Sequence, residues 1–484
     1  MRNRNAIASV VGNILFIISG LELIPAAVDY LSGSEEYHIF LGTAFFTSTL
    51  GGMLMLGFKS YEEQVLNRKM IYLVTTVLWI ATPLAAALPI FIAISHISFA
   101  DAVFEAASGL TTTGSTILTG LDDMPKGILL WRAILQWIGG VGIIVLGIWI
   151  LPVLQVGGMA LFKTESSDQS EKTYPRTIEL IKRILAAYTF ITVACIVTYA
   201  LLGMNLFDAL THSLATVSTG GFSTHDQSFN YFHNSNLEWA ATFFMLSGAI
   251  PFIAYMRCMK GSIKPLFTDA QARVLTLFLL TTSLIMTIPV WHHSDMSFLD
   301  SFRSTLFSVT SIVTTTGFVT VDYTTLGAAV TTTFLILTLV GGSTGSTAGG
   351  IKIFRFAVLW QTLLSVFHKM IYPHGVYISR YNGRILDNDL MISVMVFISV
   401  FLTFLALLTV ALGFTGMMPL EAFSAAATAI ANVGPGMGEA IGPSGNFATI
   451  SESAKWLMSL GMIVGRLEFL TVFVLFTPYF WHDM

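Results

Sequence analysis

Long apolar runs separated by short polar turns dominate this chain. A helix needs about 20 apolar residues to cross a bilayer. Ten segments reach that length, at roughly 8–31, 39–58, 70–95, 128–155, 179–203, 237–257, 271–291, 326–365, 389–414 and 454–480. Only a short acidic turn at 32–37 joins the first two segments, so they form a pair of their own. The pattern predicts an all-α polytopic membrane protein.

Inside each of the other four pairs lies a shorter apolar segment of about a dozen residues, which cannot cross a bilayer. Each runs into a glycine motif: TTTGS at 111–115, STGGFS at 218–223, TTTGF at 314–318 and NVGPG at 432–436. We expect each to form a helix beginning near an acidic or polar residue 12 or 13 positions before its motif glycine, namely Asp101, Asp208, Ser304 and Glu421. Such residues suit the positive helix N-terminus, and the negative end then points toward the glycine loop, which suits a cation.

The order of span, short helix, glycine loop and span therefore occurs four times. In a membrane protein this is the layout of a pore whose filter is assembled from four re-entrant loops. We expect four pseudo-symmetric helix, pore-helix, filter-loop and helix repeats around one pore, plus two extra N-terminal transmembrane helices. The expected units are the N-terminal helix pair at 1–62 and pore repeats at 63–165, 166–262, 263–375 and 376–484.

Composition supports a membrane protein and excludes a soluble one. Of the 484 residues 54% are hydrophobic and only 11% are charged, and the mean hydropathy is +0.74. A formal net charge of −4 gives no argument for nucleic-acid binding. The longest polar stretch, 163–182, is too short to form a separate soluble domain. Cys195 and Cys258 lie in or beside predicted spans, which favours buried thiols over a disulfide or a metal site.

Charge placement predicts the orientation in the membrane. Most of the 24 basic residues lie on the side away from the glycine loops: Arg2, Arg4, Lys59, Arg68, Lys69, Lys163, Lys172, Arg176, Lys182, Arg183, Arg257, Lys260, Lys264, Arg273, Lys352, Arg355, Lys369, Arg380 and Arg384. The positive-inside rule then puts both termini in the cytoplasm and all four glycine loops outside. The apolar segment at 1–31 is longer than a usual signal sequence, so we interpret it as a retained first helix.

The glycine loops have the chemistry of a cation filter. Backbone carbonyls can replace the water of a dehydrated ion, and glycine allows backbone conformations and close approaches that other residues do not. The candidate ligands are Thr112, Thr113, Gly114, Ser218, Thr219, Gly220, Thr315, Thr316, Gly317, Asn432, Val433 and Gly434. No loop carries an acidic residue, which argues for a monovalent ion over calcium. The competing interpretation is that small residues merely allow close helix packing, but four loops in register argue against it.

With these motifs the chain resembles the Trk/Ktr/HKT superfamily of potassium transporters over essentially its whole length. The extra N-terminal pair, IGGVGIIVL at 138–146, GGFSTHD at 220–226 and GRLEF at 465–469 are most similar to the bacterial TrkH/TrkG branch. A single filter glycine per repeat fits this family, whereas the TVGYG of ordinary potassium channels is missing, and the fourth loop departs from the Thr-rich pattern. The resemblance implies potassium uptake across the bacterial inner membrane, a homodimer, and a cytosolic TrkA-like nucleotide-binding ring. Potassium would be the transported ion, with no covalently bound cofactor.

The eighth span contains GGSTGSTAGGIK at 341–352. Glycine costs about 1 kcal/mol relative to alanine inside a helix, so this density predicts an unwound segment, which survives in a membrane only when enclosed by protein or lining a cavity. The resemblance implies an intramembrane gate formed by Gly341, Gly342, Ser343, Thr344, Gly345, Ser346, Thr347, Ala348, Gly349 and Gly350. A phosphate-binding loop is the alternative, but Lys352 lies one residue off that pattern and no strand precedes it.

Arg466 is a basic residue inside the last predicted span, and charge within a membrane is a functional signal by default. We expect it to face the pore below the filter; Glu468, two residues away, points in a different direction on a helix. His225 and Asp226 either shape the outer mouth or form a solvated pair.

Three function classes remain to be compared. A channel-like potassium uptake protein is favoured over a symporter coupled to H+ or Na+, because the predicted pore offers few titratable groups. A membrane scaffold or receptor would not need four loops in register. An enzyme is not expected, since no pair of membrane carboxylates suggests hydrolysis.

Overall fold

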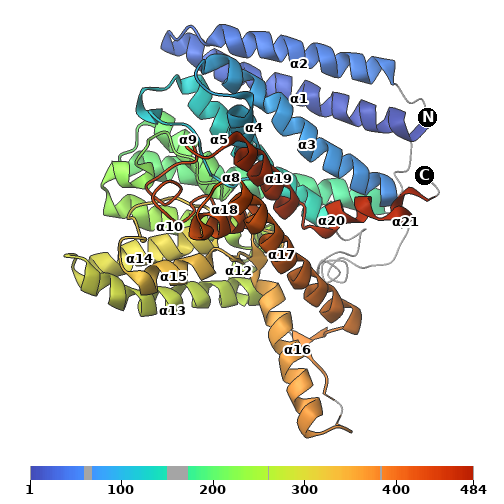
Figure 1. The fold of residues 1–484 in the computed structure, drawn as a ribbon, viewed down its shortest axis with the longest axis vertical. Helices are drawn as coiled ribbons and strands as arrows, with labels where there is room; N and C mark the ends of the chain where they lie inside the picture. The colour runs from blue at the N-terminus through green and yellow to red at the C-terminus, as the bar shows by residue number, and fades with distance from the viewer. Residues whose placement is uncertain are drawn as a thin grey trace.

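The computed structural model describes residues 2–58, 68–149, 173–259, 261–375, 377–381 and 384–482, and these are mostly helical (Figure 1). The N-terminal pair is formed by α1 (Arg2–Ser32) and α2 (Tyr37–Gly57), which lie side by side at the top of Figure 1. Seven described helices are long and apolar enough to cross a membrane, and two bent helix pairs also qualify. The predicted all-α polytopic fold is confirmed.

The remaining helices and strands follow the order of the predicted repeats. The first repeat contains α3 (Arg68–Ala93), α4 (Phe99–Leu110), η1 (Leu121–Asp123) and α5 (Lys126–Trp149), and the second contains α8 (Thr173–Leu201), α9 (Leu206–Val217), η2 (Ser228–Phe232), α10 (Ser235–Ala249) and α11 (Phe252–Cys258). The third contains α12 (Lys264–Thr268), α13 (Ala270–His293), α14 (Phe298–Val313), α15 (Ala328–Leu337), β1 (Val340–Gly341), β2 (Ile351–Lys352) and α16 (Ile353–Ile371). The fourth contains β3 (Arg380–Tyr381), β4 (Arg384–Ile385), α17 (Asn388–Phe414), α18 (Pro419–Ala431), α19 (Glu452–Arg466), α20 (Leu470–Phe473), η3 (Val474–Phe476) and α21 (Pro478–Trp481).

Several sequence predictions fall outside the described residues. The boundaries at 62–63 and 165–166 do so, as do residue 376 and the end of the predicted span 128–155. Lys59, Lys163, Lys172 and Lys260 also lie there. Among the described parts, the start of α1 and the C-terminal α21 lie on the same side of the molecule (Figure 1).

The four short helices α4, α9, α14 and α18 form the centre of the protein, and most of their residues are buried. Three begin at a polar N-cap whose side chain accepts a bond from a backbone amide three residues on: Ser98, Asn205 and Ser297. The third position of each helix is acidic. Ser304 was therefore wrongly predicted as a helix start, because α14 begins at Phe298, after the N-cap Ser297, and Ser304 is buried inside it.

Two spans that were predicted as continuous are broken. The axis turns by 96° between α10 and α11 and by 102° between α19 and the α20–η3 segment. Pro251 explains the first break, because it lacks the amide that would continue α10 and keeps Ile250 extended. At the second, Glu468 and Phe469 both adopt positive φ, and the buried Phe469 ring packs among Phe397, Phe401 and Phe404.

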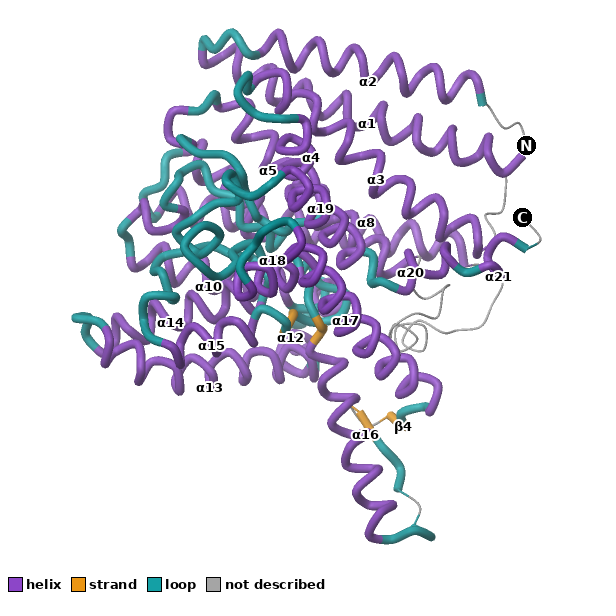
Figure 2. The backbone as a smooth tube through the Cα atoms, in the orientation of Figure 1, coloured by secondary structure: helices purple, strands orange, loops and turns teal. Residues whose placement is uncertain are grey.

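The predicted break in the eighth span is confirmed. Between α15 and α16 the chain leaves the helix, and the loop from 341 to 350 is closed by parallel pairing of β1 with β2. Gly345 and Gly350 adopt positive φ there, a conformation that costs glycine little. Figure 2 shows this loop and those that follow the short helices as irregular backbone gathered in the middle of the helical body.

Candidate functional site

The four glycine loops share one backbone conformation. The second residue after α4, α9 and α14 and the first residue after α18 are left-handed, with φ of 53° at Thr112, 52° at Thr219, 57° at Thr315 and 56° at Asn432. Two residues later a glycine has positive φ in every loop: Gly114, Gly221, Gly317 and Gly434. A β-branched residue in this region is strained, and such strain gathers at functional sites. Asn tolerates it better than Thr, so the departure at Asn432 preserves the shape of the fourth loop.

One part of the sequence prediction is displaced by one residue. We expected Gly220 to take the special backbone conformation of the second loop, but Gly221 adopts it. Gly220 instead matches Thr113, Thr316 and Val433, the middle residues of the other loops. The match is seen in the hydrogen bond from each middle amide to the carbonyl five residues earlier, which joins Thr113 to Ser108, Gly220 to Ala215, Thr316 to Ser311 and Val433 to Thr428.

The four glycine loops contact one another in turn and form a closed ring. A methyl group added to any of the four glycines would lie less than 3.0 Å from the middle carbonyl oxygen of the next loop. The pairs follow in order: Gly114 on Gly220, Gly221 on Thr316, Gly317 on Val433, and Gly434 on Thr113. Each glycine is therefore needed for close approach as well as for its conformation. We call this arrangement the glycine ring.

A cavity of about 290 Å³ adjoins the glycine ring. All four ring glycines line it, together with Arg132, Asp226 and the loop from 442 to 447. The polar side chains and backbone at its wall suit a hydrated ion. The cavity lies on the side of the glycine ring that is lined by the residues following the ring glycines in the sequence.

The 341–350 loop contacts the first residues of two glycine loops. Thr347 Oγ1 lies 3.1 Å from Thr219 Oγ1, and the amide of Gly349 donates to Thr315 Oγ1 at 2.7 Å. Backbone bonds also tie the loop to the end of α10, from Ser343 to Ala249 at 3.0 Å. The loop is thus enclosed by protein, as an irregular intramembrane segment must be.

Arg466 and the 341–350 loop line the same second cavity, which also includes Asn432 and Lys352. Its volume of about 30 Å³ is room for about one water molecule, far less than the first cavity. Arg466 is 3% exposed, and within the described residues none of its guanidinium nitrogens has a hydrogen-bond partner. Glu468 does not pair with it but with Arg355 of α16, at 2.6 Å. The structure thus brings Arg466, the loop and the base of the fourth glycine loop together.

The sequence matches the TrkH family, described as cation transport proteins, over residues 37–482. The chain belongs to the TrkH family. It is 45% identical to the Trk system potassium uptake protein TrkI of Halomonas elongata over 85% of this chain and 84% of that protein. It is 33% identical to TrkH of Escherichia coli strain K12 over 99% of both chains. The crystal structure of the potassium transporter TrkH from Vibrio parahaemolyticus matches it with a TM-score of 0.91, 34% identity and 99% coverage of both chains.

The family assignment makes this chain a membrane transporter and not an enzyme. The predicted resemblance to this family is confirmed. The roles of the individual loop residues stay predictions, which the arrangement of the glycine ring now makes specific.

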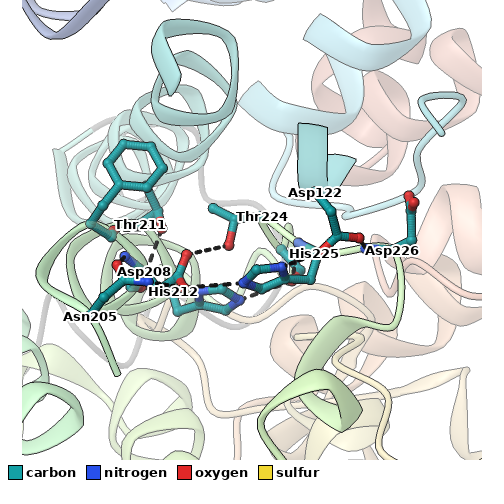
Figure 3. Close-up of polar contacts among 10 residues, drawn as sticks. Asp122, Asn205, Asp208, Thr211, His212, Thr224, His225 and Asp226 are labelled. Atoms are coloured by element: carbon teal, nitrogen blue, oxygen red, sulfur yellow. Dashed lines mark hydrogen bonds and ion pairs between the residues drawn. The ribbon is translucent and has the colours of Figure 1, made fainter. Parts of the chain in front are cut away.

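A polar cluster lies beside the first cavity of this TrkH-family chain, where η1 meets the start of α9 (Figure 3). His225 Nδ1 lies 2.5 Å from Asp122 Oδ1, and its Nε2 lies 3.1 Å from Asp208 Oδ2. The ring stacks on Tyr231 with centroids 3.5 Å apart. Burial lowers the pKa of His225, but the bonds to Asp208 and Asp122 and their charges outweigh it and raise the pKa. The cluster therefore joins the first and second repeats outside the ring.

Asp226 belongs to the same region and is not a freely solvated group. Its carboxylate accepts hydrogen bonds from the amides of Gly120 and Leu121 at 3.0 and 3.2 Å. His225 and Asp226 both line the first cavity, and Asp226 is exposed, so their role at an outer mouth stays a prediction.

Sequence reasoning missed several residues that hold the glycine loops of this TrkH-family fold. Gly139, Gly248 and Gly465 let the second helix of three repeats approach the end of the short helix, where a methyl group would meet a carbonyl oxygen within 3.0 Å. Gln136 contacts the second loop directly. The available signal was a polar residue inside an apolar span next to a glycine pair, at 136–140.

Proposed function

We propose that this protein takes up potassium across the bacterial inner membrane, along the electrochemical gradient, through one pore within each chain. The closed glycine ring is the observation that carries the proposal. Four strained loops at the ends of four buried helices bring main-chain oxygens and the negative ends of helix dipoles to one place. The printed names of the relatives, Trk system potassium uptake proteins, supply the ion.

In this proposal potassium is held at three residues of each loop, from the residue with the left-handed conformation to the ring glycine. In the second loop Ser218, which comes directly before these three residues, also contributes. The first cavity is the outer vestibule, and the 341–350 loop with Arg466 is the gate beneath the filter. The small second cavity supports a closed gate in this conformation, since about 30 Å³ holds about one water molecule. Arg466 would lower cation occupancy there by repulsion.

A channel-like route is favoured over symport with H+ or Na+. In the described residues the carboxylates that line the two cavities are Asp226 and Glu468. Asp226 accepts two backbone amides, and Glu468 pairs with Arg355. Both carboxylates therefore already have partners, and neither is left free to bind and release a coupling ion along the permeation path.

The proposal includes orientation and partners. Both termini and the basic face lie in the cytoplasm, as the positive-inside rule predicts, and the glycine loops lie outside. A homodimer and a cytosolic TrkA-like ring that binds nucleotides are the proposed assembly. The described chain itself is a helical membrane unit, so nucleotide control would come from that partner.

Potassium flux into proteoliposomes, with Gly317→Ser, tests the proposed function. Serine at this position must adopt a φ of 82° and place its Cβ against the Val433 carbonyl oxygen, so the ring cannot close normally. We expect loss of at least about tenfold in potassium selectivity or flux, since strain and overpacking each cost about 1–3 kcal/mol.

Gly42→Ser is the matched control, because a Cβ at this exposed position of α2 would meet nothing within 4 Å. Wild-type protein that carries no potassium, or Gly317→Ser protein with unchanged flux and selectivity, would overturn the proposal.

A further inference from the structure

Gln136 joins the first repeat to the glycine loop of the second. It lies on α5 and is fully buried, with 0% exposure. Its Nε2 donates to the carbonyl oxygen of Gly220 at 2.6 Å, and its Oε1 accepts from the amide of Phe222 at 3.1 Å. One side-chain amide therefore holds the backbone on both sides of Gly221.

The contact is close enough to restrict the sequence of the loop. A Cβ at Gly220 would lie within 3.0 Å of three atoms of the Gln136 amide. The other three loops have Thr or Val at this middle position. Glycine at 220 is thus explained by the approach of Gln136, whereas the backbone φ explains the glycine at 221.

The hydrogen bond from Gln136 to the Gly220 carbonyl also makes the second quadrant of the glycine ring different from the other three. Gly220 O is the oxygen against which Gly114 packs. In the described part of the chain no side chain donates to the corresponding oxygens of Thr113, Thr316 or Val433. Among the described residues, therefore, a side-chain donor fixes the middle carbonyl in the second quadrant of the ring and in no other quadrant.

Arg132, one helical turn before Gln136, strengthens the same attachment. Its Nη1 donates to the carbonyl of Ser223 at 3.0 Å, and its guanidinium lies 4.1 Å from the centroid of the Phe222 ring. Residues four apart share one helix face. One face of α5 thus holds the backbone from 220 to 223 in place.

We propose that Gln136 is a positioning residue that sets the ion selectivity of the pore by fixing the Gly220 carbonyl. This inference rests on the proposed function, since it assumes that the glycine ring contacts the ion. A carbonyl oxygen has two lone pairs, so it can accept from Gln136 and still face a cation. Holding it in place keeps the ring from adapting to a smaller ion.

Gln136→Glu and Gln136→Met test the inference by the K+/Na+ permeability ratio, measured from reversal potentials in planar bilayers. Methionine is similar in length but forms neither bond. An ionised glutamate can still accept from Phe222 but repels the Gly220 oxygen, whereas a protonated one reproduces both contacts of the amide. One net hydrogen bond corresponds to about a two- to tenfold change in the ratio.

We therefore expect a lowered ratio in Gln136→Met at every pH. In Gln136→Glu we expect a lowered ratio at a pH high enough to ionise the buried glutamate, and recovery toward the wild-type ratio as the pH falls. A purely structural role would not give pH-dependent rescue of selectivity. Gln227→Glu and Gln227→Met, in the exposed outer loop, are the matched controls. The wild type recorded at each pH corrects for other titrating groups.

The outcomes separate this inference from the proposed function. Variants that conduct potassium with the wild-type ratio at every pH overturn the role of Gln136 and leave potassium uptake standing. A low ratio in Gln136→Glu that does not recover in acid also overturns it. A wild-type protein that does not conduct potassium at all overturns the proposed function instead.

Discussion

Thr347 attaches the 341–350 loop to its surroundings through one buried hydroxyl. Its Oγ1 donates to the carbonyl oxygens of Gly248 at 3.0 Å and Val217 at 3.2 Å, and it accepts from Thr219 Oγ1 at 3.1 Å. Valine has nearly the same shape without the hydroxyl. Thr347→Val should therefore remove these contacts and keep the backbone bond from the Thr347 amide to Gly248.

The expected size follows from one net hydrogen bond. A single hydroxyl proton is shared between two carbonyls, so the loss counts once, at about 1 kcal/mol. If the contacts exist only while the loop closes the path, the closed state loses this free energy and the open one does not. The ratio of open to closed protein should then rise about fivefold.

Single-channel recording separates this effect from a change in the filter. We expect a higher open probability with unchanged unitary conductance. Thr333→Val is the matched control, because Thr333 is half-buried on α15 and, within the described residues, its hydroxyl donates to Ala329 of its own helix. Unchanged open probability would refute the reasoning, and so would a change in conductance alone, since the hydroxyl would then serve the filter.

Two further predictions concern charged groups. Arg466→Ala should raise potassium flux several-fold because it removes a buried positive charge from the second cavity, whereas Arg466→Lys should keep flux low; unchanged or reduced flux in normally inserted Arg466→Ala protein contradicts this. The raised pKa of His225 stabilises the folded protein below pH 6.5, and this contribution is lost as the pH rises through the folded-state pKa. The melting temperature should therefore fall as the pH rises above 6.5, and less steeply in His225→Gln; equal slopes would refute the role of the cluster.

The sequence predicted what depends on local patterns. Apolar length located the spans, and the density of glycine located the break at 341–350, because both act on the backbone where they occur. The capping signal was also present but was misinterpreted in the third repeat: SFLD at 297–300 matches SFAD at 98–101 and NLFD at 205–208. The spacing to the motif glycine, taken from the other repeats, indicated Ser304 instead.

Features that depend on distant contacts could not be predicted. The sequence cannot show which of the adjacent glycines at 220 and 221 adopts the positive φ. Their roles differ only in φ and in the approach of Gln136, which depends on the folded structure. The turn after α19 likewise depends on partners from other elements: Arg355 binds Glu468, and three phenylalanines enclose Phe469. Neither partner is near in sequence.

If the 341–350 loop is the gate and the glycine ring is the filter, as proposed, the contacts between them argue that gating and ion selection are coupled. Thr219 and Thr315 are held in a left-handed conformation that is strained for a β-branched residue, and both hydroxyls contact this loop. Moving the loop aside removes contacts that help to hold two of the four strained residues. The glycine ring would then lose support in its second and third quadrants, while Asn432, which tolerates this conformation, keeps the fourth. The second quadrant retains Gln136, so its attachment to α5 becomes more important when the loop has moved than when it is in place.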